Sequence, residues 1–188
     1  MNPTYFFISF LVLVCQMSTL ALVKAGIPLN EKLIAYWSFD QPAGNTVRDD
    51  SKNGRKGLLK GPQWVAGKYG NALKFDGKDD YVDLVPTSAK LFDNMRAFTI
   101  TAWVKPEKKA MLDWPAIIEK YEGNKRNDMP WVGYYEAKNE WGWEITTNKG
   151  ENILHYTGIQ VSFGVFSYVA FTIDISNKVS KFHMNDVM

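Results

Sequence analysis

The sequence predicts an all-β protein, a two-sheet antiparallel β-sandwich of the jelly-roll type. Apolar and polar residues alternate over short segments, turn residues separate these segments, and helical periodicity is scarce. The clearest example lies at residues 67–77, where glycines permit tight turns at both ends. Between them, Leu73 and Phe75 point to the same face of an extended segment.

The first 25 residues are predicted to be a secretory signal peptide. An apolar core at residues 6–15 is followed by small residues around a cleavage site after Ala25. Two alternatives stay open. Residues 5–23 approach the roughly 20 residues that span a bilayer as an uncleaved anchor, and Cys15 could carry a lipid.

A short linker at residues 26–32 and one domain at residues 33–188 are expected to follow. This part of the chain contains no cysteine, so apolar burial or a bound metal must stabilise it in place of disulfides. The chain carries 22 Lys+Arg and 20 Asp+Glu, which leaves no strong field to recruit nucleic acid. We expect a secreted or cell-surface protein whose partner is a glycan or an extracellular protein, with membrane contact only if the N-terminal segment is retained.

The domain is expected to begin with a strand at residues 33–39, where Trp37 and Phe39 share one face. A polar stretch at residues 40–61 then predicts a long surface connection with little core of its own. The remaining predicted strands include one within 67–77 and others at 81–85, 97–106, 117–120, 131–136, 141–147, 153–156, 168–173 and 179–184. Those at 131–136 and 141–147, and the last two, are expected to form hairpins.

Five segments keep a fixed order along the chain: 33–40, 50–54, 67–77, 80–82 and 98–106. Together they resemble the LamG-like jelly roll of the concanavalin A-like lectin/glucanase superfamily, from about Leu33 to the end. The resemblance implies two antiparallel sheets packed face to face. It also implies that the core includes Trp37, Phe39, Leu73, Phe75, Phe98 and Ile100.

The hairpin at residues 168–186 is similar to a late hairpin of this family, with Tyr168 near the place of a tryptophan and Asp186 in place of a glycine. Further strands follow that hairpin in the family. The resemblance therefore implies a domain that lacks its last strands at the C-terminus. The strand at residues 33–39 would then expose an unpaired edge.

No catalytic pattern stands out, and we expect a protein that is not an enzyme. Glycosidases need two facing carboxyl groups, roughly 5–9.5 Å apart, and the hydrolases of this superfamily place acids at alternate positions of one strand. Glu144 is a lone strand carboxylate, more typical of a surface group. His155 and His183 have no cysteine partner after residue 25, and nucleophile-elbow, Walker and dinucleotide-binding motifs are absent.

Four aspartates cluster around the Gly77 turn: Asp76, Asp79, Asp80 and Asp83. Calcium takes several oxygen ligands from carboxylates and carbonyls, and the resemblance implies a structural calcium ion near Asp40 and Gly77. The candidate ligands are Asp40, Asp76, Gly77 and Asp80. The alternative is a set of ordinary β-turn aspartates.

Residues 114–156 are dense in aromatic side chains. Flat rings with polar neighbours suit the stacking of sugars, although part of this set is expected to belong to the core. Trp114 and Trp131 lie at loop–strand borders and are expected to be exposed. The candidate ligand-binding residues are Trp114, Trp131, Tyr134 and Glu144. We expect a non-catalytic module that recognises carbohydrate or glycoprotein; the alternatives are a structural or adhesion spacer and a degenerate glycoside hydrolase relative.

Overall fold

The fold is built almost wholly of β-strands, which confirms the predicted class. The computed structural model describes residues 4–7, 12–13, 33–40, 42, 44–84, 95–107, 114–122, 130–146 and 150–185. Within these ranges the only helical element is a 3-10 turn, η1 (Glu136–Lys138). None of the described residues forms a helix that could cross a membrane.

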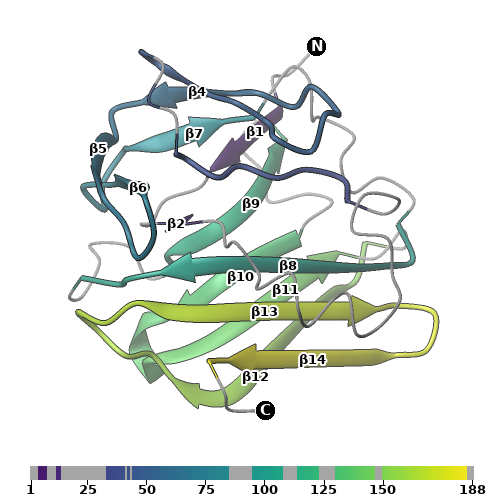
Figure 1. Ribbon diagram of the computed structural model, residues 1–188. Helices are drawn as coiled ribbons and strands as arrows, with labels where there is room; N and C mark the ends of the chain where they lie inside the picture. The colour runs from purple at the N-terminus through teal and green to yellow at the C-terminus, as the bar shows by residue number, and fades with distance from the viewer. Residues whose placement is uncertain are drawn as a thin grey trace, which may run out of the picture.

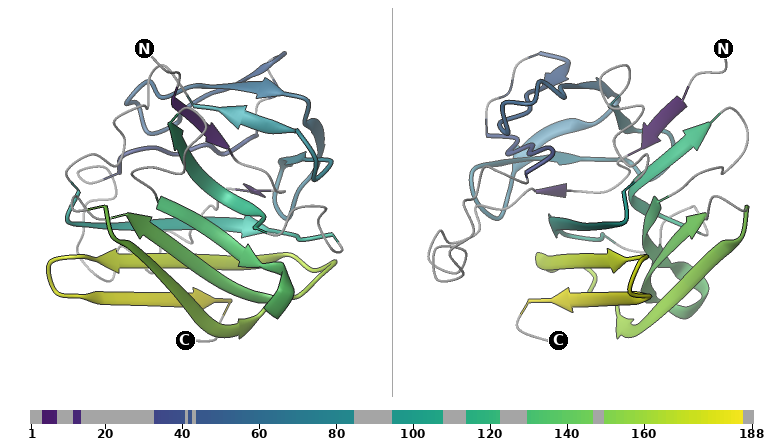
Figure 2. Two further views of the ribbon diagram at one scale, coloured as in Figure 1. Left: turned by 180° about the vertical axis from the view of Figure 1, so that it is seen from behind. Right: turned by 90° about the vertical axis from the view of Figure 1, so that its right-hand side faces the viewer.

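Two larger antiparallel sheets form the sandwich (Figure 1). The five-stranded sheet consists, in spatial order, of β1 (Thr4–Phe7), β9 (Ala116–Glu122), β10 (Pro130–Tyr135), β11 (Glu140–Thr146) and β12 (Asn152–Gln160). The four-stranded sheet consists of β14 (Val179–Met184), β13 (Ser167–Asp174), β8 (Ala97–Val104) and β2 (Val12–Leu13). The two views of Figure 2 show β13 and β14 layered against the strands β10 to β12.

Alternating side chains of the two sheets fill the space between them. Along β13, inward residues such as Phe171 are fully buried and alternate with half-buried outward ones. Phe171 meets Trp141 of the opposite sheet, with ring centroids 6.4 Å apart. Burial of such a side chain contributes about 1.5–3 kcal/mol. The predicted core residues Trp37, Phe39 and Leu73 are buried, whereas Phe75, Phe98 and Ile100 pack half-buried against them.

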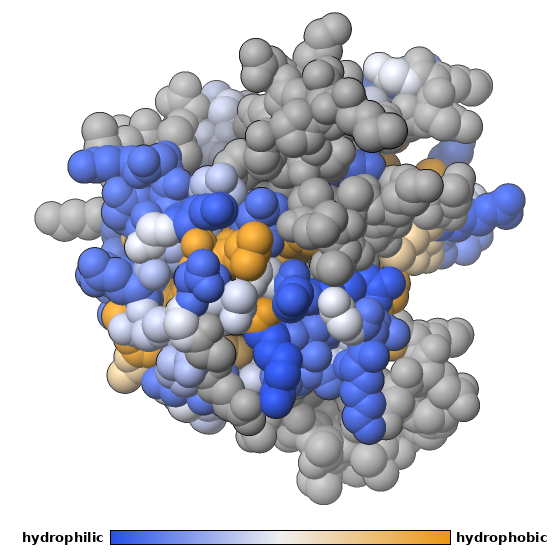
Figure 3. Space-filling model, turned by 90° about the horizontal axis from the view of Figure 1, so that it is seen from above, coloured by the Kyte–Doolittle hydropathy of each residue, from blue (hydrophilic) through white to orange (hydrophobic). Residues whose placement is uncertain are grey.

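Two small sheets cover one end of the sandwich, at the top of Figure 1. They comprise β3 (Thr46–Val47), β4 (Gly57–Lys60) and β7 (Tyr81–Asp83) in one, and the hairpin of β5 (Gln63–Ala66) and β6 (Asn71–Lys74) in the other. Seen from above, the described residues are mostly hydrophilic, with hydrophobic atoms exposed between the polar ones (Figure 3).

Residues 40–61 were expected to form a long surface connection with little core of its own, and this expectation is wrong. This stretch contributes β3 and β4, and Val47 is only 1% exposed. Gly57 explains the tight packing, because a Cβ there would lie 2.5 Å from a methyl carbon of Val82 and 2.9 Å from one of Val47. The short strand predicted within residues 67–77 is β6, and the strand predicted at 81–85 is β7, which ends at Asp83.

The strand expected at residues 33–39 is not formed, although its predicted burial is right for Trp37 and Phe39. The backbone of Phe39 has a φ of 59°, which is incompatible with an extended strand. Consequently the unpaired strand edge expected there does not arise. The segment is attached by single hydrogen bonds, such as that from the Asp50 N–H to the Tyr36 carbonyl at 2.7 Å.

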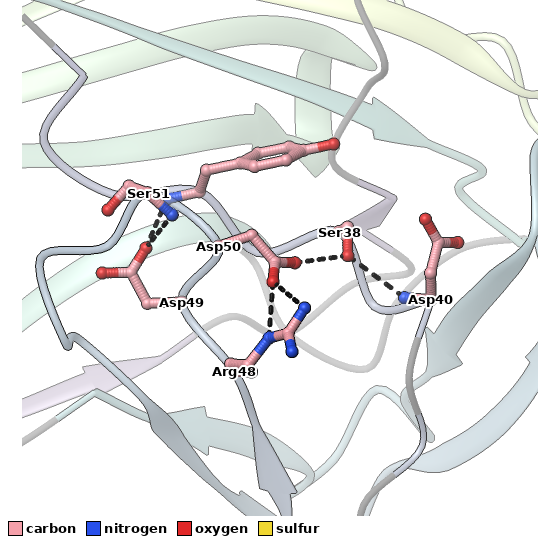
Figure 4. A network of polar contacts seen from close by, with 7 residues as sticks. Ser38, Asp40, Arg48, Asp49, Asp50 and Ser51 are labelled. Atoms are coloured by element: carbon pink, nitrogen blue, oxygen red, sulfur yellow. Dashed lines mark hydrogen bonds and ion pairs between the residues drawn. The ribbon is translucent and has the colours of Figure 1, made fainter. Parts of the chain in front are cut away.

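Asp49 is the main anchor of this segment (Figure 4). Its side chain accepts hydrogen bonds from the backbone N–H groups of Tyr36 at 3.1 Å, Ser51 at 2.9 Å and Arg55 at 2.9 Å. The residue is only 7% exposed. Burial favours the neutral carboxyl, but the hydrogen bonds from Ser51, Arg55 and Tyr36 outweigh it and lower the pKa of Asp49.

Asp50 forms a second, more exposed connection in the same network. Its carboxylate accepts a hydrogen bond from the Ser38 hydroxyl at 2.6 Å and pairs with the Arg48 guanidinium (Figure 4). Asp49 and Asp50 thus fasten residues 33–40 to the loop that precedes β4.

Residues of the predicted signal peptide take part in both large sheets. The strand β1 pairs antiparallel with β9, and β2 pairs with β8. Each lies at the outer side of its sheet. Cleavage after Ala25 stays a prediction, and in the uncleaved chain these two strands are the neighbours of β9 and β8.

Candidate functional site

The outer face of the five-stranded sheet carries aromatic and acidic residues that no local sequence pattern brings together. Residues directly opposite each other on antiparallel strands share a face. Trp131 lies opposite Glu144, and Tyr135 lies opposite Glu140. Tyr156 of β12 lies opposite Gly142, and therefore on the same face.

Three rings form a row on this face, which we call the aromatic row: Trp114, Tyr135 and Tyr156. The centroids of Trp114 and Tyr135 lie 4.5 Å apart with the planes tilted by 33°, and those of Tyr135 and Tyr156 lie 5.5 Å apart with a tilt of 38°. All three side chains are half-buried. The Nζ of Lys138 lies 4.0 Å from the centroid of Tyr156 and ends the row with a cation–π contact.

Two glycines opposite each other leave room for backbone carbonyl groups next to these rings. A Cβ on Gly133 would lie 2.0 Å from the Pro115 carbonyl oxygen, and one on Gly142 would lie 2.8 Å from the His155 carbonyl oxygen. The Pro115 carbonyl also accepts a hydrogen bond from the Tyr134 N–H at 3.1 Å. The close approach of residues 114–116 to β10, which positions Trp114, therefore depends on Gly133.

Trp131 lies beneath the aromatic row, and the expectation that it is exposed is wrong. Its side chain is 0% exposed and packs with Ala116 and Trp114 in a small cluster outside the main core. The Trp114 and Trp131 rings meet edge to face at 5.3 Å and 76°. Trp131 is shielded from solvent because Trp114, which precedes β9, packs over it.

Tyr134 points to the opposite face of the sheet. It is 1% exposed and packs in the core against Trp141 and Phe163, each at 5.9 Å. Of the four residues predicted to bind ligand, only Trp114 and Glu144 are therefore half-buried on the outer face. Tyr135 and Tyr156 were in the aromatic-rich stretch but were not singled out, because their position in the row depends on strand register.

The surroundings of the aromatic row are acidic on one side. Burial is the main cause that raises the pKa of the Tyr156 hydroxyl, and Tyr135, Glu140 and Glu144 add to it. Glu140 is also structural, since its carboxylate accepts the backbone N–H of Gly158 where the pairing of β11 and β12 becomes irregular. The row thus lies between carboxylates on β11 and the ammonium group of Lys138.

The aspartate turn forms a compact oxygen-rich group on the small sheets. Asp76, Asp79 and Asp80 each offer one carboxylate oxygen within 4.8 Å of the others. Asp76 already accepts the Lys78 N–H at 2.9 Å, which lowers the pKa of Asp76, and Asp80 accepts the Asp76 N–H at 2.9 Å. These are the bonds of an ordinary turn, so calcium binding stays a prediction.

The other two predicted calcium ligands differ in their positions. Gly77 lies in the turn with a φ of 76°, as its place in the motif predicts. Asp40 is not part of the aspartate group. Its carboxylate lies against Gly70, where a Cβ would be only 2.0 Å from Oδ1, and its carbonyl accepts the Asn71 side chain at 3.2 Å.

A family model described as the concanavalin A-like lectin/glucanases superfamily matches residues 76–187. The chain belongs to this superfamily. The match confirms the resemblance and includes the strands β8 to β14, and so the aromatic row. The segments at 33–40 and 50–54 lie outside the matched residues. No curated protein and no solved structure matches the chain.

Proposed function

We propose that this domain is a non-catalytic binding module that recognises carbohydrate, free or on a glycoprotein. The aromatic row is the observation that carries the proposal. Membership of a superfamily of lectins and glucanases supports it at the coarse level of a carbohydrate-binding or adhesion module. The apolar segment at residues 6–15 supports export to the cell surface or the medium.

The chemistry of the row suits a sugar. The C–H groups of a pyranose pack against aromatic rings, and tilted rings that are half-buried leave part of their surface for this contact. The carboxylates of Glu140 and Glu144 can accept hydrogen bonds from hydroxyl groups, and Lys138 can donate them. Apolar rings with a few polar groups beside them are typical of ligand sites.

The arrangement of the carboxylates favours binding over hydrolysis. Glu119 and Glu144 both lie opposite Trp131 and share its face, on the strands to either side. Their backbones lie two strand spacings apart, about 9.6 Å, and Trp131 lies on the strand between them. Glu119 is only 7% exposed. We expect the Glu144→Gln variant and the native chain to be equally inactive towards oligosaccharides.

Glycan-array binding by the full chain tests the proposal. We expect saturable binding that weakens about tenfold, or about 1.4 kcal/mol, in Trp114→Ala and in Tyr156→Ala. Tyr69→Ala is the matched control, because Tyr69 is 53% exposed but contacts Trp103 of β8, in the other large sheet. Absence of saturable binding would favour the structural or adhesion spacer, and an equal loss in the control would show that the row is not the site.

A further inference from the structure

The strand β12 is the last strand of the five-stranded sheet, and within the described residues no strand pairs with its outer side. It lies with β14 along one flank of the sandwich, at the bottom of Figures 1 and 2. Its first four residues are exposed, including Ile153 at 44% and Leu154 at 39%. The flank therefore presents open backbone together with exposed apolar side chains.

The composition of β12 sets it apart from the other strands near the margins of the sheets. Edge strands usually carry charged residues that prevent pairing with another chain. Over its nine residues β12 has no Asp, Glu, Lys or Arg. By contrast, β14, the edge strand on the same flank, carries Lys181. Among the described strands, the edge strands β1 and β2 also lack charged residues but have only four and two residues, whereas β12 offers nine residues with exposed apolar side chains and no charge.

We propose that β12 pairs antiparallel with β12 of a second copy of this chain, forming a dimer with a continuous sheet. The ladder between β11 and β12 is regular over Asn152 to Tyr156 and then becomes irregular. With a two-fold axis at Leu154, the centre of this stretch, all five residues pair with the second copy. This symmetry places Leu154 opposite Leu154 of the second copy, and Ile153 opposite His155 of the second copy.

The five-residue stretch is complementary to itself in this register. No like charges meet, so the pairing has no electrostatic cost. The His155 ring stacks on Trp143 at 5.5 Å and 24°, and provides a flat surface for Ile153 of the second copy. A partner protein whose strand carries charged residues would lose this complementarity. A second copy of the chain is therefore favoured over an unrelated partner.

The dimer would bring together two outer faces of the five-stranded sheet. Tyr156 lies on β12 and faces outward, so the aromatic rows of the two copies would lie on one continuous surface. Two linked sites raise the apparent affinity for a repetitive ligand without any new contact. The pairing itself does not depend on what the row binds.

The mass of the full chain in solution, measured by light scattering over a wide range of concentrations, tests the pairing. We expect a reversible dimer in the native chain and its loss in Ile153→Lys. Val179→Lys is the matched control, because Val179 is 42% exposed on β14, along the same flank, and its substitution should leave the dimer intact. A monomeric native chain, or a dimer that survives Ile153→Lys, would overturn the proposal.

Disulfide trapping tests the register and does not depend on a destabilising change. The single native cysteine, Cys15, is first replaced by serine. Leu154→Cys should then form a covalent dimer, because directly opposite residues lie within the roughly 4.4–6.8 Å that a disulfide spans. Ile153→Cys should not, since the two copies of this residue would be diagonal neighbours about 7–8 Å apart. Crosslinking of both variants, or of neither, would contradict the proposed axis.

Discussion

Replacement of Asp49 by alanine should detach residues 33–40 from the loop that precedes β4. The carboxylate accepts three backbone N–H groups, from Tyr36, Ser51 and Arg55. Alanine removes both acceptor oxygens, and with them all three hydrogen bonds, and leaves a space that is only slightly open to water, because Asp49 is 7% exposed. We therefore expect the largest stability loss of any single polar substitution in the network of Figure 4.

The magnitude follows from the hydrogen bonds. A bond to a charged group contributes about 1.5–3 kcal/mol, but the three donors belong to half-buried residues that water can partly reach. Taking about 1 kcal/mol for each lost bond, the middle of the general range for hydrogen bonds, gives a loss of about 3 kcal/mol. For a domain of this size that lowers Tm by about 6–12 °C.

Urea unfolding followed by circular dichroism measures the loss. Asp50→Ala is the matched control, since it removes a neighbouring carboxylate that pairs with the exposed Arg48 and should cost about 1 kcal/mol or less. Equal effects of Asp49→Ala and Asp50→Ala would refute the view that the buried backbone contacts determine the stability here.

The pH dependence has a defined sign. The folded pKa of Asp49 is lowered, so its stabilising contribution is present above the unfolded pKa of about 3.9 and is lost as the pH falls through the folded pKa. Asp49→Asn cannot titrate. The variant should therefore be less stable than the native chain at neutral pH but should lose less stability in acid, and parallel acid-unfolding curves would contradict this.

Three further outcomes are expected. Leu73→Ala should lower the free energy of unfolding by about 2–5 kcal/mol because Leu73 is 0% exposed, whereas Leu33→Ala, at a 38% exposed position, should change it by about 0.5 kcal/mol or less. Gly133→Ala should displace the Pro115 carbonyl and cost about 1–3 kcal/mol, visible as a red shift of tryptophan fluorescence and a lower urea midpoint. If the aspartate turn binds calcium, added Ca²⁺ should raise Tm in the native chain but not in Asp80→Asn; no shift in the native chain would remove calcium as a cofactor.

The strands with regular alternation could be predicted from the sequence because their two faces have different neighbours. The strand at β8 and the hairpins of β10 with β11 and of β13 with β14 lie close to their expected positions. In each, apolar residues recur at alternate positions on the inward face, and turn residues mark the ends.

Other parts of the fold depend on contacts that the local pattern does not contain. The segment at residues 33–39 has the right alternation for burial, but Phe39 adopts a left-handed conformation and interrupts the strand. The short strands β4 and β5 lie among glycine, lysine and proline and lack a recognisable period. They are strands because β4 pairs with β3 and β7, and β5 pairs with β6.

The candidate site, like the fold, could be predicted only in part from the sequence. Aromatic density indicated the stretch that contains the aromatic row, and Trp114, which was expected to be exposed, is half-buried in that row. The sequence could not show that Trp131 lies beneath it, or that Tyr135 and Tyr156 meet across two strands, because both facts follow from strand register and from the course of the loop before β9.

The attachment of residues 33–40 by side chains has a consequence for how the domain opens. A strand inside a sheet is released only when its neighbours separate, whereas a segment held by side-chain contacts and single backbone hydrogen bonds can open without separating any pair of strands. Trp37, whose indole N–H donates to the Arg55 carbonyl at 2.7 Å, would leave with it and expose the end of the core that it covers. Opening of residues 33–40 would therefore uncover part of the core without separating any pair of strands.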